Sequence, residues 1–129
     1  MLEIGLKGEA AEVVSENNTA KAVKSGELDV YATPAMIALM EQAAYKSVAA
    51  ELEDGQGTVG TSISVRHLAA TPIGMKVTAK SKLAEIDGRR LVFVLEVWDE
   101  AVKIGEGIHE RVLIQNEAFL TKANAKLER

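Results

Sequence analysis

The chain has no cysteine among its 129 residues. This absence excludes a disulfide scaffold, a thiolate zinc site and a cysteine nucleophile. Positive charge is also scarce, because 15 lysines and arginines stand against 19 aspartates and glutamates, for a net charge of -4. Nucleic-acid binders normally present a basic face, so we expect no nucleic-acid partner.

Long apolar runs are missing as well. The longest weakly polar stretch, residues 31–40, is far shorter than the ~20 residues that cross a bilayer. The first ten residues, MLEIGLKGEA, include a glutamate at position 3 and lack the apolar centre of a signal peptide. We therefore expect a cytoplasmic protein with no membrane partner.

The remaining composition is that of an ordinary globular protein, with 47% hydrophobic and 26% charged residues. A chain of this length buries about two-thirds of its unfolded surface, which is enough for a stable core without disulfides or a metal ion. We expect a single domain spanning residues 1–129.

One long helix is the clearest element in the sequence. Thr33 is a good N-cap, and Pro34 suits the first helical position, where a missing N–H costs nothing. The apolar spacing continues to about residue 53, and Asp54-Gly55 is typical of a helix end. The sequence predicts a helix over residues 34–53, capped by the Thr33 hydroxyl.

After the helix the hydrophobic period changes to two, which indicates strands. Residues 58–68 predict a strand with one face formed by Val59, Thr61, Ile63, Val65 and His67. Residues 75–83 predict a second strand with Met75, Val77, Ala79, Ser81 and Leu83 towards the core. Residues 105–115 predict a further strand, and a short helix capped by Asn116 follows, with an apolar stripe formed by Phe119, Leu120, Ala123 and Leu127.

Asp87-Gly88 predicts a hairpin. A two-residue loop there would place Glu96 on the core face, because one residue of slip turns every side chain over. A three-residue loop avoids this and pairs Leu83 with Phe93, Ser81 with Leu95 and Ala79 with Val97. One apolar helix against an antiparallel sheet is an α+β layer pair, for which a hotdog fold is a candidate.

Glu41 is the most informative residue of the helix. Its neighbours at helical spacing belong to the face that a sheet would cover: Ile37, Ala38, Ala44, Tyr45 and Val48. An unpaired buried carboxylate costs several kcal/mol, so Glu41 must be protonated, paired or directed into a cavity. A structural glutamate bonded to backbone or to Tyr45 and a functional acid are both consistent with this position.

His67 also lies on an apolar face, at the end of its strand. A lone histidine there is more often a core residue than a catalyst. However, helix and sheet must bury their apolar faces together, which brings Glu41 and His67 into one layer, within a chain or across a dimer. An acid beside a histidine is a general-base arrangement in outline.

Two other patterns exclude rival chemistries. Residues 55–60 fit G-x-G-x-x-G, but they follow a helix and open a strand, which is the reverse of a dinucleotide-binding loop. His67 and His109 are far apart in sequence and lack any metal-ligand spacing. His109 and Arg111 share one face of their strand, and Glu110 takes the other. We expect neither a nucleotide cofactor nor a metal.

Four blocks, in this order, resemble the hotdog thioesterases of the fluoroacetyl-CoA thioesterase-like family. They are YATPAMIALMEQAA (31–44), VGTSISVRHLAATPIGM (59–75), EIDGRRLVFVLEVWDE (85–100) and IGEGIHERVLI (104–114). The resemblance covers nearly the whole chain. It implies a hotdog homodimer, with higher oligomers open, whose helices pack back to back and whose acyl-CoA sites lie at the subunit interface. It implies no cofactor, since coenzyme A enters as part of the substrate.

The resemblance also implies the site residues. A catalytic threonine, glutamate and histidine correspond to Thr33, Glu41 and His67. Gly60 corresponds to the glycine whose backbone N–H binds the thioester oxygen, and Arg111 to a basic residue near the coenzyme. Thr33 then attacks or orients water, Glu41 polarises it, and His67 transfers the proton.

The family's fluoroacetyl specificity is associated with phenylalanines in the loop before the threonine, where this chain has Val23, Leu28 and Val30. A general acyl-CoA thioesterase is therefore the prediction. Two alternatives remain open: a non-catalytic acyl-CoA or small-ligand binding protein, and a hotdog enoyl-CoA hydratase. The hydratases usually place their histidine on or just before the helix, and this helix has none.

Overall fold

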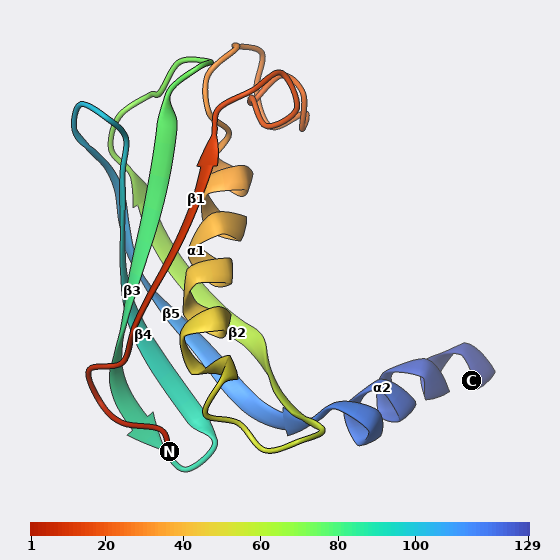
Figure 1. The fold of residues 1–129 in the computed structure, drawn as a ribbon. Helices are drawn as coiled ribbons and strands as arrows, with labels where there is room; N and C mark the ends of the chain where they lie inside the picture. The colour runs from red at the N-terminus through yellow and green to blue at the C-terminus, as the bar shows by residue number, and fades with distance from the viewer.

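The computed structural model describes all residues from 1 to 129 (Figure 1). The chain forms, in order, β1 (Lys7–Val13), α1 (Thr33–Ala49), β2 (Gln56–His67), β3 (Lys76–Asp87), β4 (Arg90–Trp98), β5 (Lys103–Gln115), α2 (Asn116–Asn124) and a 3-10 helix (Ala125–Glu128). None of the helices combines the length and apolar character that a bilayer-crossing segment needs.

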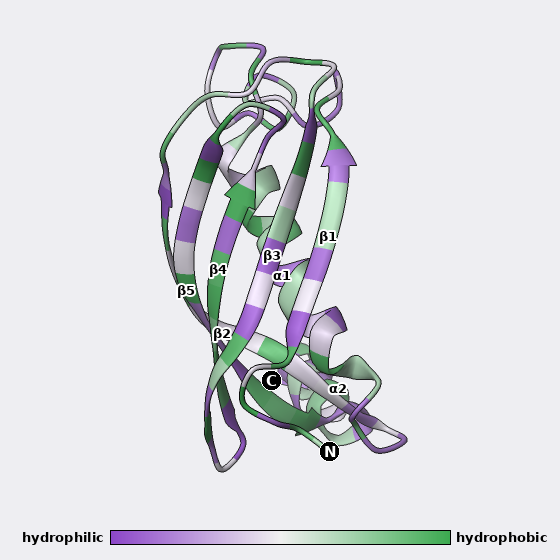
Figure 2. Ribbon diagram, turned by 60° about the vertical axis from the view of Figure 1, so that its left-hand side comes forward, coloured by the Kyte–Doolittle hydropathy of each residue, from purple (hydrophilic) through white to green (hydrophobic).

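The five strands form one antiparallel sheet in the order β1-β3-β4-β5-β2, so β1 and β2 are its edges. The sheet curls around α1, which lies along its inner face (Figure 1). Hydrophobic and hydrophilic residues alternate along β3, whereas β4 is hydrophobic over most of its length (Figure 2). Burial alternates along β4 and along β3 as far as Leu83, as expected for strands with one face on a core. The predicted α+β layer pair is present.

The buried face of α1 differs in part from the prediction. The helix buries Met36, Leu39, Met40, Ala43, Ala44 and Val48 against the sheet. Ala44 and Val48 were expected there, but Ala38 and Tyr45 are exposed. A helix has room for only one such stripe, and the side chains towards β1 and β3 form it. The flank of α1 that carries Glu41 is therefore open in a single chain.

Both ends of α1 also differ from the prediction. Regular helix ends at Ala49 rather than at residue 53. After Ala49 the hydrogen bonds span three residues instead of four, from Glu51 N–H to Val48 O and from Leu52 N–H to Ala49 O. At the other end, the N-cap is Ala32, and no side chain caps the helix.

The β3–β4 hairpin has the predicted core register but reaches it differently. Leu83 pairs with Phe93, Ser81 with Leu95 and Ala79 with Val97, as expected. However, Asp87 pairs with Arg90, so the loop has two residues, and the extra residue is a bulge at Ala84. Burial of the apolar face determines the register. The bulge at Ala84 takes up one residue, so that this register is compatible with a two-residue loop.

A second bulge, in β2, changes which residues face α1. Gly60 pairs with Arg111 and Ser62 with Glu110, which leaves Thr61 as the extra residue. The predicted uninterrupted alternation of residues 59–67 is therefore wrong before the bulge. Gly60, rather than Val59, faces the helix, because a Cβ at Gly60 would lie 2.8 Å from Glu41 Oε2.

The C-terminal helix α2 extends away from the sheet (Figure 1). Its N-cap is Gln115 rather than the predicted Asn116, and no side chain caps it. The predicted apolar stripe is exposed along its length, including Phe119, Leu120 and Leu127.

Gly8 allows α1 to approach β1 closely, and this contact predicts a large effect on stability. A Cβ at Gly8 would collide with the Ala43 carbonyl oxygen and would lie 2.5 Å from Ser47 Cβ. We expect Gly8→Ala to lower the free energy of unfolding by about 1–3 kcal/mol, as overpacking does. Urea unfolding measures this, with Glu9→Ala on the exposed face of β1 as the control. Equal stability of Gly8→Ala and the wild type would contradict the close approach.

Candidate functional site

Thr33 and His67 form a side-chain pair at one end of the molecule. Thr33 is the first residue of α1 and His67 the last of β2. The Thr33 Oγ1 atom lies 2.7 Å from His67 Nδ1, which is hydrogen-bond distance. The hydroxyl contacts the histidine instead of the helix backbone, so the predicted capping role of Thr33 is wrong.

The surroundings of His67 favour a neutral imidazole. Burial lowers the pKa of His67, because the charged form loses hydration. The other ring nitrogen, Nε2, is buried and has no hydrogen-bond partner in the chain. A neutral imidazole beside a hydroxyl is the arrangement of a general base with its nucleophile or water-orienting group.

A pocket of about 400 Å³ lies against this pair. Its walls are mostly small or apolar and come from the loop before α1 and the segment after β2: Ala20, Val30, Leu68, Ala69 and Ala70. Ser25, Thr33 and His67 supply the polar groups of its surface. Tyr31 also lines it, but its hydroxyl donates to Glu12 Oε2 at 2.6 Å. The pocket therefore joins a partly apolar lining to the Thr33 hydroxyl and the His67 imidazole.

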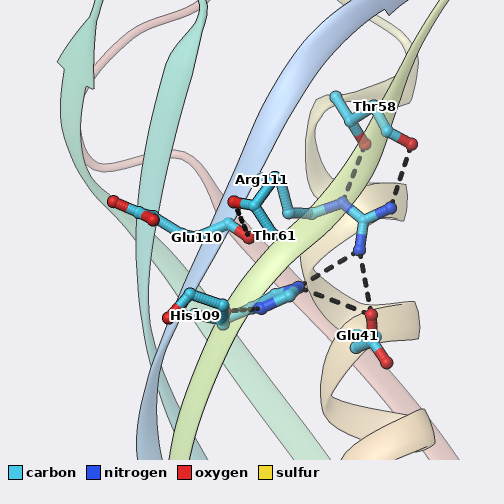
Figure 3. A network of polar contacts seen from close by, with 7 residues as sticks. Glu41, Thr58, Thr61, His109, Glu110 and Arg111 are labelled. Atoms are coloured by element: carbon cyan, nitrogen blue, oxygen red, sulfur yellow. Dashed lines mark hydrogen bonds and ion pairs between the residues drawn. The ribbon is translucent and has the colours of Figure 1, made fainter.

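Glu41 belongs to a second cluster, shown in Figure 3. Its Oε2 atom accepts a hydrogen bond from Arg111 Nη1 at 3.3 Å. Arg111 also donates from Nε to Thr58 Oγ1 at 2.8 Å and from Nη2 to Thr58 O at 3.0 Å. His109 completes the cluster, with its Nε2 atom 3.1 Å from Arg111 Nη1. Helix α1 and strands β2 and β5 thus contribute to one polar network.

The degree of burial differs strongly within this cluster. Arg111 is 7% exposed and His109 is 1% exposed. The Glu41 side chain is 41% exposed, so the prediction of a buried carboxylate is wrong for a single chain. Of the three states expected for Glu41, the structure has the paired one. Its second carboxylate oxygen points away from the cluster (Figure 3).

Arg111 remains close to a carboxylate and an aromatic ring despite its burial. Burial lowers the pKa of Arg111, whereas Glu41 and Tyr45 raise it. The guanidinium nevertheless keeps its charge in proteins, because its normal pKa lies far above neutral pH. Its Cζ atom lies 5.8 Å from the Tyr45 ring centroid, within the range of a cation–π contact.

The two clusters do not meet within one chain. Thr33 and Glu41 are eight residues apart on α1, or about 12 Å along the helix axis. No hydrogen bond or ion pair joins Glu41 to His67. Of the two arrangements that the sequence allowed for this pair, contact within a chain is therefore absent. No group of three or more histidine, aspartate or glutamate side chains is arranged to hold a metal ion.

The family model for fluoroacetyl-CoA-specific thioesterases matches residues 14–117. The chain belongs to this family. It is 43% identical over 98 residues to the fluoroacetyl-CoA thioesterase of Streptantibioticus cattleyicolor, covering 76% of this chain and 70% of the relative.

Similarity to solved structures supports the same family assignment. A structure of the fluoroacetyl-CoA thioesterase FlK matches with a TM-score of 0.92 and 35% identity over 98% of both chains. A variant of FlK solved with fluoroacetate and CoA matches with a TM-score of 0.86 and 35% identity over 92% of this chain and 99% of that one. A hot-dog-like protein from Thermanaerovibrio acidaminovorans shares the fold, with a TM-score of 0.88 and 23% identity over 97% and 93% of the two chains.

These similarities confirm three sequence predictions. The resemblance to the fluoroacetyl-CoA-specific thioesterase family is confirmed, as is the hotdog fold. The enzyme class, thioester hydrolase, is confirmed at the level of the family. The dimer and the roles of the five site residues stay predictions.

His109 and Thr58 are the members of the second cluster that the sequence did not suggest as functional. The sequence did contain a signal for His109, because His109 and Arg111 lie two positions apart and therefore share one face of a strand. If that face is the buried one, an arginine there requires partners from other elements. Only the pairing of β5 with β2 and its packing near α1 show that Thr58, His109 and Glu41 are those partners.

Proposed function

We propose that the protein hydrolyses an acyl-coenzyme A to the free acid and coenzyme A at the pocket beside Thr33 and His67. The contact of 2.7 Å between Thr33 Oγ1 and His67 Nδ1 carries this proposal, because it joins a hydroxyl to a neutral base at the surface of an apolar pocket. Membership of a thioesterase family and the similarity to FlK, a variant of which binds fluoroacetate and CoA, support it.

The reaction needs an attacking oxygen and a base that accepts its proton. In one route, Thr33 Oγ1 attacks the thioester carbonyl carbon and its proton passes to His67 Nδ1. The C–S bond breaks, the proton goes to the departing coenzyme A thiolate, and water then hydrolyses the threonine ester. In the other route, a water held by Thr33 attacks the carbonyl carbon and gives a proton to His67; the C–S bond then breaks, and His67 returns the proton to the departing coenzyme A thiolate. Intact-protein mass spectrometry after rapid quenching separates the routes, since only the first adds an acyl group to Thr33.

Glu41 enters this chemistry from a second copy of the chain. Within its own chain it lies about 12 Å along α1 from Thr33. One of its oxygens is held by Arg111, while its side chain is 41% exposed on the open flank of α1. A two-fold dimer in which α1 helices pack back to back brings this flank against the other copy. There the carboxylate polarises the attacking oxygen.

Gly60 joins Glu41 in this half of the site. It lies at the bulge of β2, where a Cβ would be 2.8 Å from Glu41 Oε2. The lack of a side chain allows an acyl carbonyl to approach the backbone closely. We assign to Gly60 the backbone N–H that stabilises negative charge on the thioester oxygen.

The acyl group that fits this pocket is uncharged. No lysine or arginine lines the pocket, so the carboxylate of a succinyl or malonyl group would lose hydration without gaining a partner. Neither phenylalanine is near it, because Phe93 lies in the core and Phe119 on α2. The aromatic residue that lines the pocket is Tyr31, whose hydroxyl is held by Glu12, so no phenylalanine from the loop before Thr33 restricts the pocket to a fluoroacetyl group.

A panel of coenzyme A thioesters tests this function. Acetyl, fluoroacetyl, butyryl, phenylacetyl and succinyl thioesters are incubated with the enzyme, and release of free thiol is measured. We expect kcat/KM for butyryl or phenylacetyl to exceed that for succinyl by at least about tenfold. Equal hydrolysis of the succinyl thioester would contradict the uncharged pocket. No thiol release from any thioester, together with a raised melting temperature, would instead support a binding protein.

A further inference from the structure

We propose that His109 is a positioning residue for Glu41: as a neutral imidazole with its proton on Nδ1, it orients Arg111, and Arg111 holds the Glu41 carboxylate. This inference rests on the proposed function for the role of Glu41. Its structural part stands on the contacts of His109 and Arg111 themselves, which Figure 3 displays.

The contacts of His109 specify its tautomer. The Nδ1 atom lies 2.8 Å from the carbonyl oxygen of Ser62, which can only accept, so Nδ1 carries the proton. The Nε2 atom lies 3.1 Å from Arg111 Nη1, which can only donate. A proton on Nε2 would place two donors against each other. His109 is therefore neutral, and its distance of 3.8 Å to Glu41 Oε2 is not an ion pair.

Arg111 has almost no freedom to bind another group. A guanidinium has five N–H donors. One Nε donor and one Nη2 donor contact Thr58, and Nη1 is shared between His109 Nε2 and Glu41 Oε2. With 7% exposure, Arg111 is placed to hold Glu41 rather than to reach a coenzyme phosphate. His109 is the partner that directs Nη1 along the line to Glu41.

The groups packed around His109 come from three elements besides its own strand. Helix α1 presents Glu41 and Tyr45 to Arg111, and β5 carries Arg111 itself. Strand β2 contributes the Ser62 carbonyl, and β4 places the Phe93 ring 6.3 Å from the imidazole. Burial is the largest effect and lowers the pKa of His109; the Ser62 hydrogen bond and the Glu41 charge raise it, the Arg111 charge lowers it, and the net direction is down.

Two substitutions separate positioning from simple packing. In His109→Gln, the side-chain oxygen can still accept from Arg111 Nη1. In His109→Asn, the shorter amide can still donate to Ser62 but no longer reaches Arg111. We expect His109→Asn to lower kcat by about 10- to 100-fold with KM within about threefold, because the carboxylate loses its alignment. We expect His109→Gln to retain kcat within about threefold.

Equal losses in both variants, in proportion to a lowered melting temperature, would show a structural histidine and overturn the proposal. Wild-type kcat in His109→Asn would overturn it as well. Both comparisons use one acyl-CoA that the wild type hydrolyses.

A spectroscopic test needs no activity, so it distinguishes this inference from the proposed function. The chain has only two histidines, and ¹⁵N-histidine labelling resolves both rings, with His67→Ala assigning the signals. We expect His109 to show protonated Nδ1 and unprotonated Nε2 from pH 5.5 to 8.5, and its Nε2 signal to move in Arg111→Met. A titrating His109, or one protonated on Nε2, would overturn the inference even if the enzyme hydrolyses acyl-CoA. Conversely, the expected spectrum from an inactive protein would leave the positioning geometry correct and the proposed function wrong.

Discussion

Replacing His67 with alanine is expected to lower kcat for acyl-CoA hydrolysis by about 10²–10⁴-fold, the usual contribution of a positioned general base. In the proposed mechanism the proton of the attacking group passes to His67 Nδ1, which lies 2.7 Å from Thr33 Oγ1 and is missing in the variant. Free-thiol release under saturating substrate measures the effect. Arg66→Ala is the matched control, because Arg66 is exposed on the other face of β2. An active His67→Ala enzyme would remove His67 from the mechanism.

The pH profile of the wild type gives the same assignment an independent check. Burial lowers the pKa of His67 below its ordinary value of 6.5. A base works in its neutral form, so kcat/KM should be constant at neutral pH. As the pH is lowered, this plateau should extend past pH 6.5 before the rate begins to fall. It should then fall about tenfold per pH unit below the lowered pKa, as one proton is taken up. This fall in kcat/KM at acid pH should be absent from the residual activity of the His67→Ala variant. A midpoint above 6.5 would contradict the effect of burial.

The second large effect is expected from replacing Glu41, which in the proposed dimer comes from a different chain than Thr33 and His67. We expect Glu41→Gln to lower kcat by about 10²–10³-fold, because a neutral amide accepts a hydrogen bond from the attacking water more weakly than a carboxylate and polarises it less. Gln42→Ala, at the next position on α1, is the control. If the melting temperature of Glu41→Gln falls while kcat does not, Glu41 is a structural residue that serves Arg111.

Mixed dimers then show whether one site uses both copies. When Glu41→Gln and His67→Ala chains are co-refolded, about half of the dimers are mixed. Each mixed dimer has one site with both substitutions and one with neither, so activity should recover to about a quarter of wild type. Thr33→Val mixed with His67→Ala is the control, because both substitutions affect the same half and no intact site can form. Absence of recovery in the first mixture would contradict a shared site, and a monomer by light scattering would contradict the dimer.

The sequence by itself determined the elements and the registers that follow from local chemistry and apolar burial. Pro34 and the spacing after it start a helix, and period-two patterns predict the strands. The β3–β4 register could be predicted from the apolar residues alone, because a slip of one residue would bury Glu96. The family resemblance, which depends on ordered motifs rather than on contacts, was also available from sequence.

Only the tertiary structure decided how the candidate residues are grouped. The Thr33 hydroxyl contacts His67 rather than capping the helix, since β2 ends beside the start of α1. The bulge at Thr61 turns Gly60 towards Glu41, although alternation predicted Val59 there. These outcomes depend on strand pairing and on the packing of elements that are distant in sequence.

The network of Glu41, Arg111 and His109 shows the physical reason most clearly. Sequence showed that His109 and Arg111 share a strand face, but a shared face does not identify a partner. The partners were determined when the apolar faces of α1 and the sheet were buried together, because that packing removed Arg111 from water and required acceptors within reach. Local patterns determine which residues face inward, whereas only the assembled layers determine which of them meet.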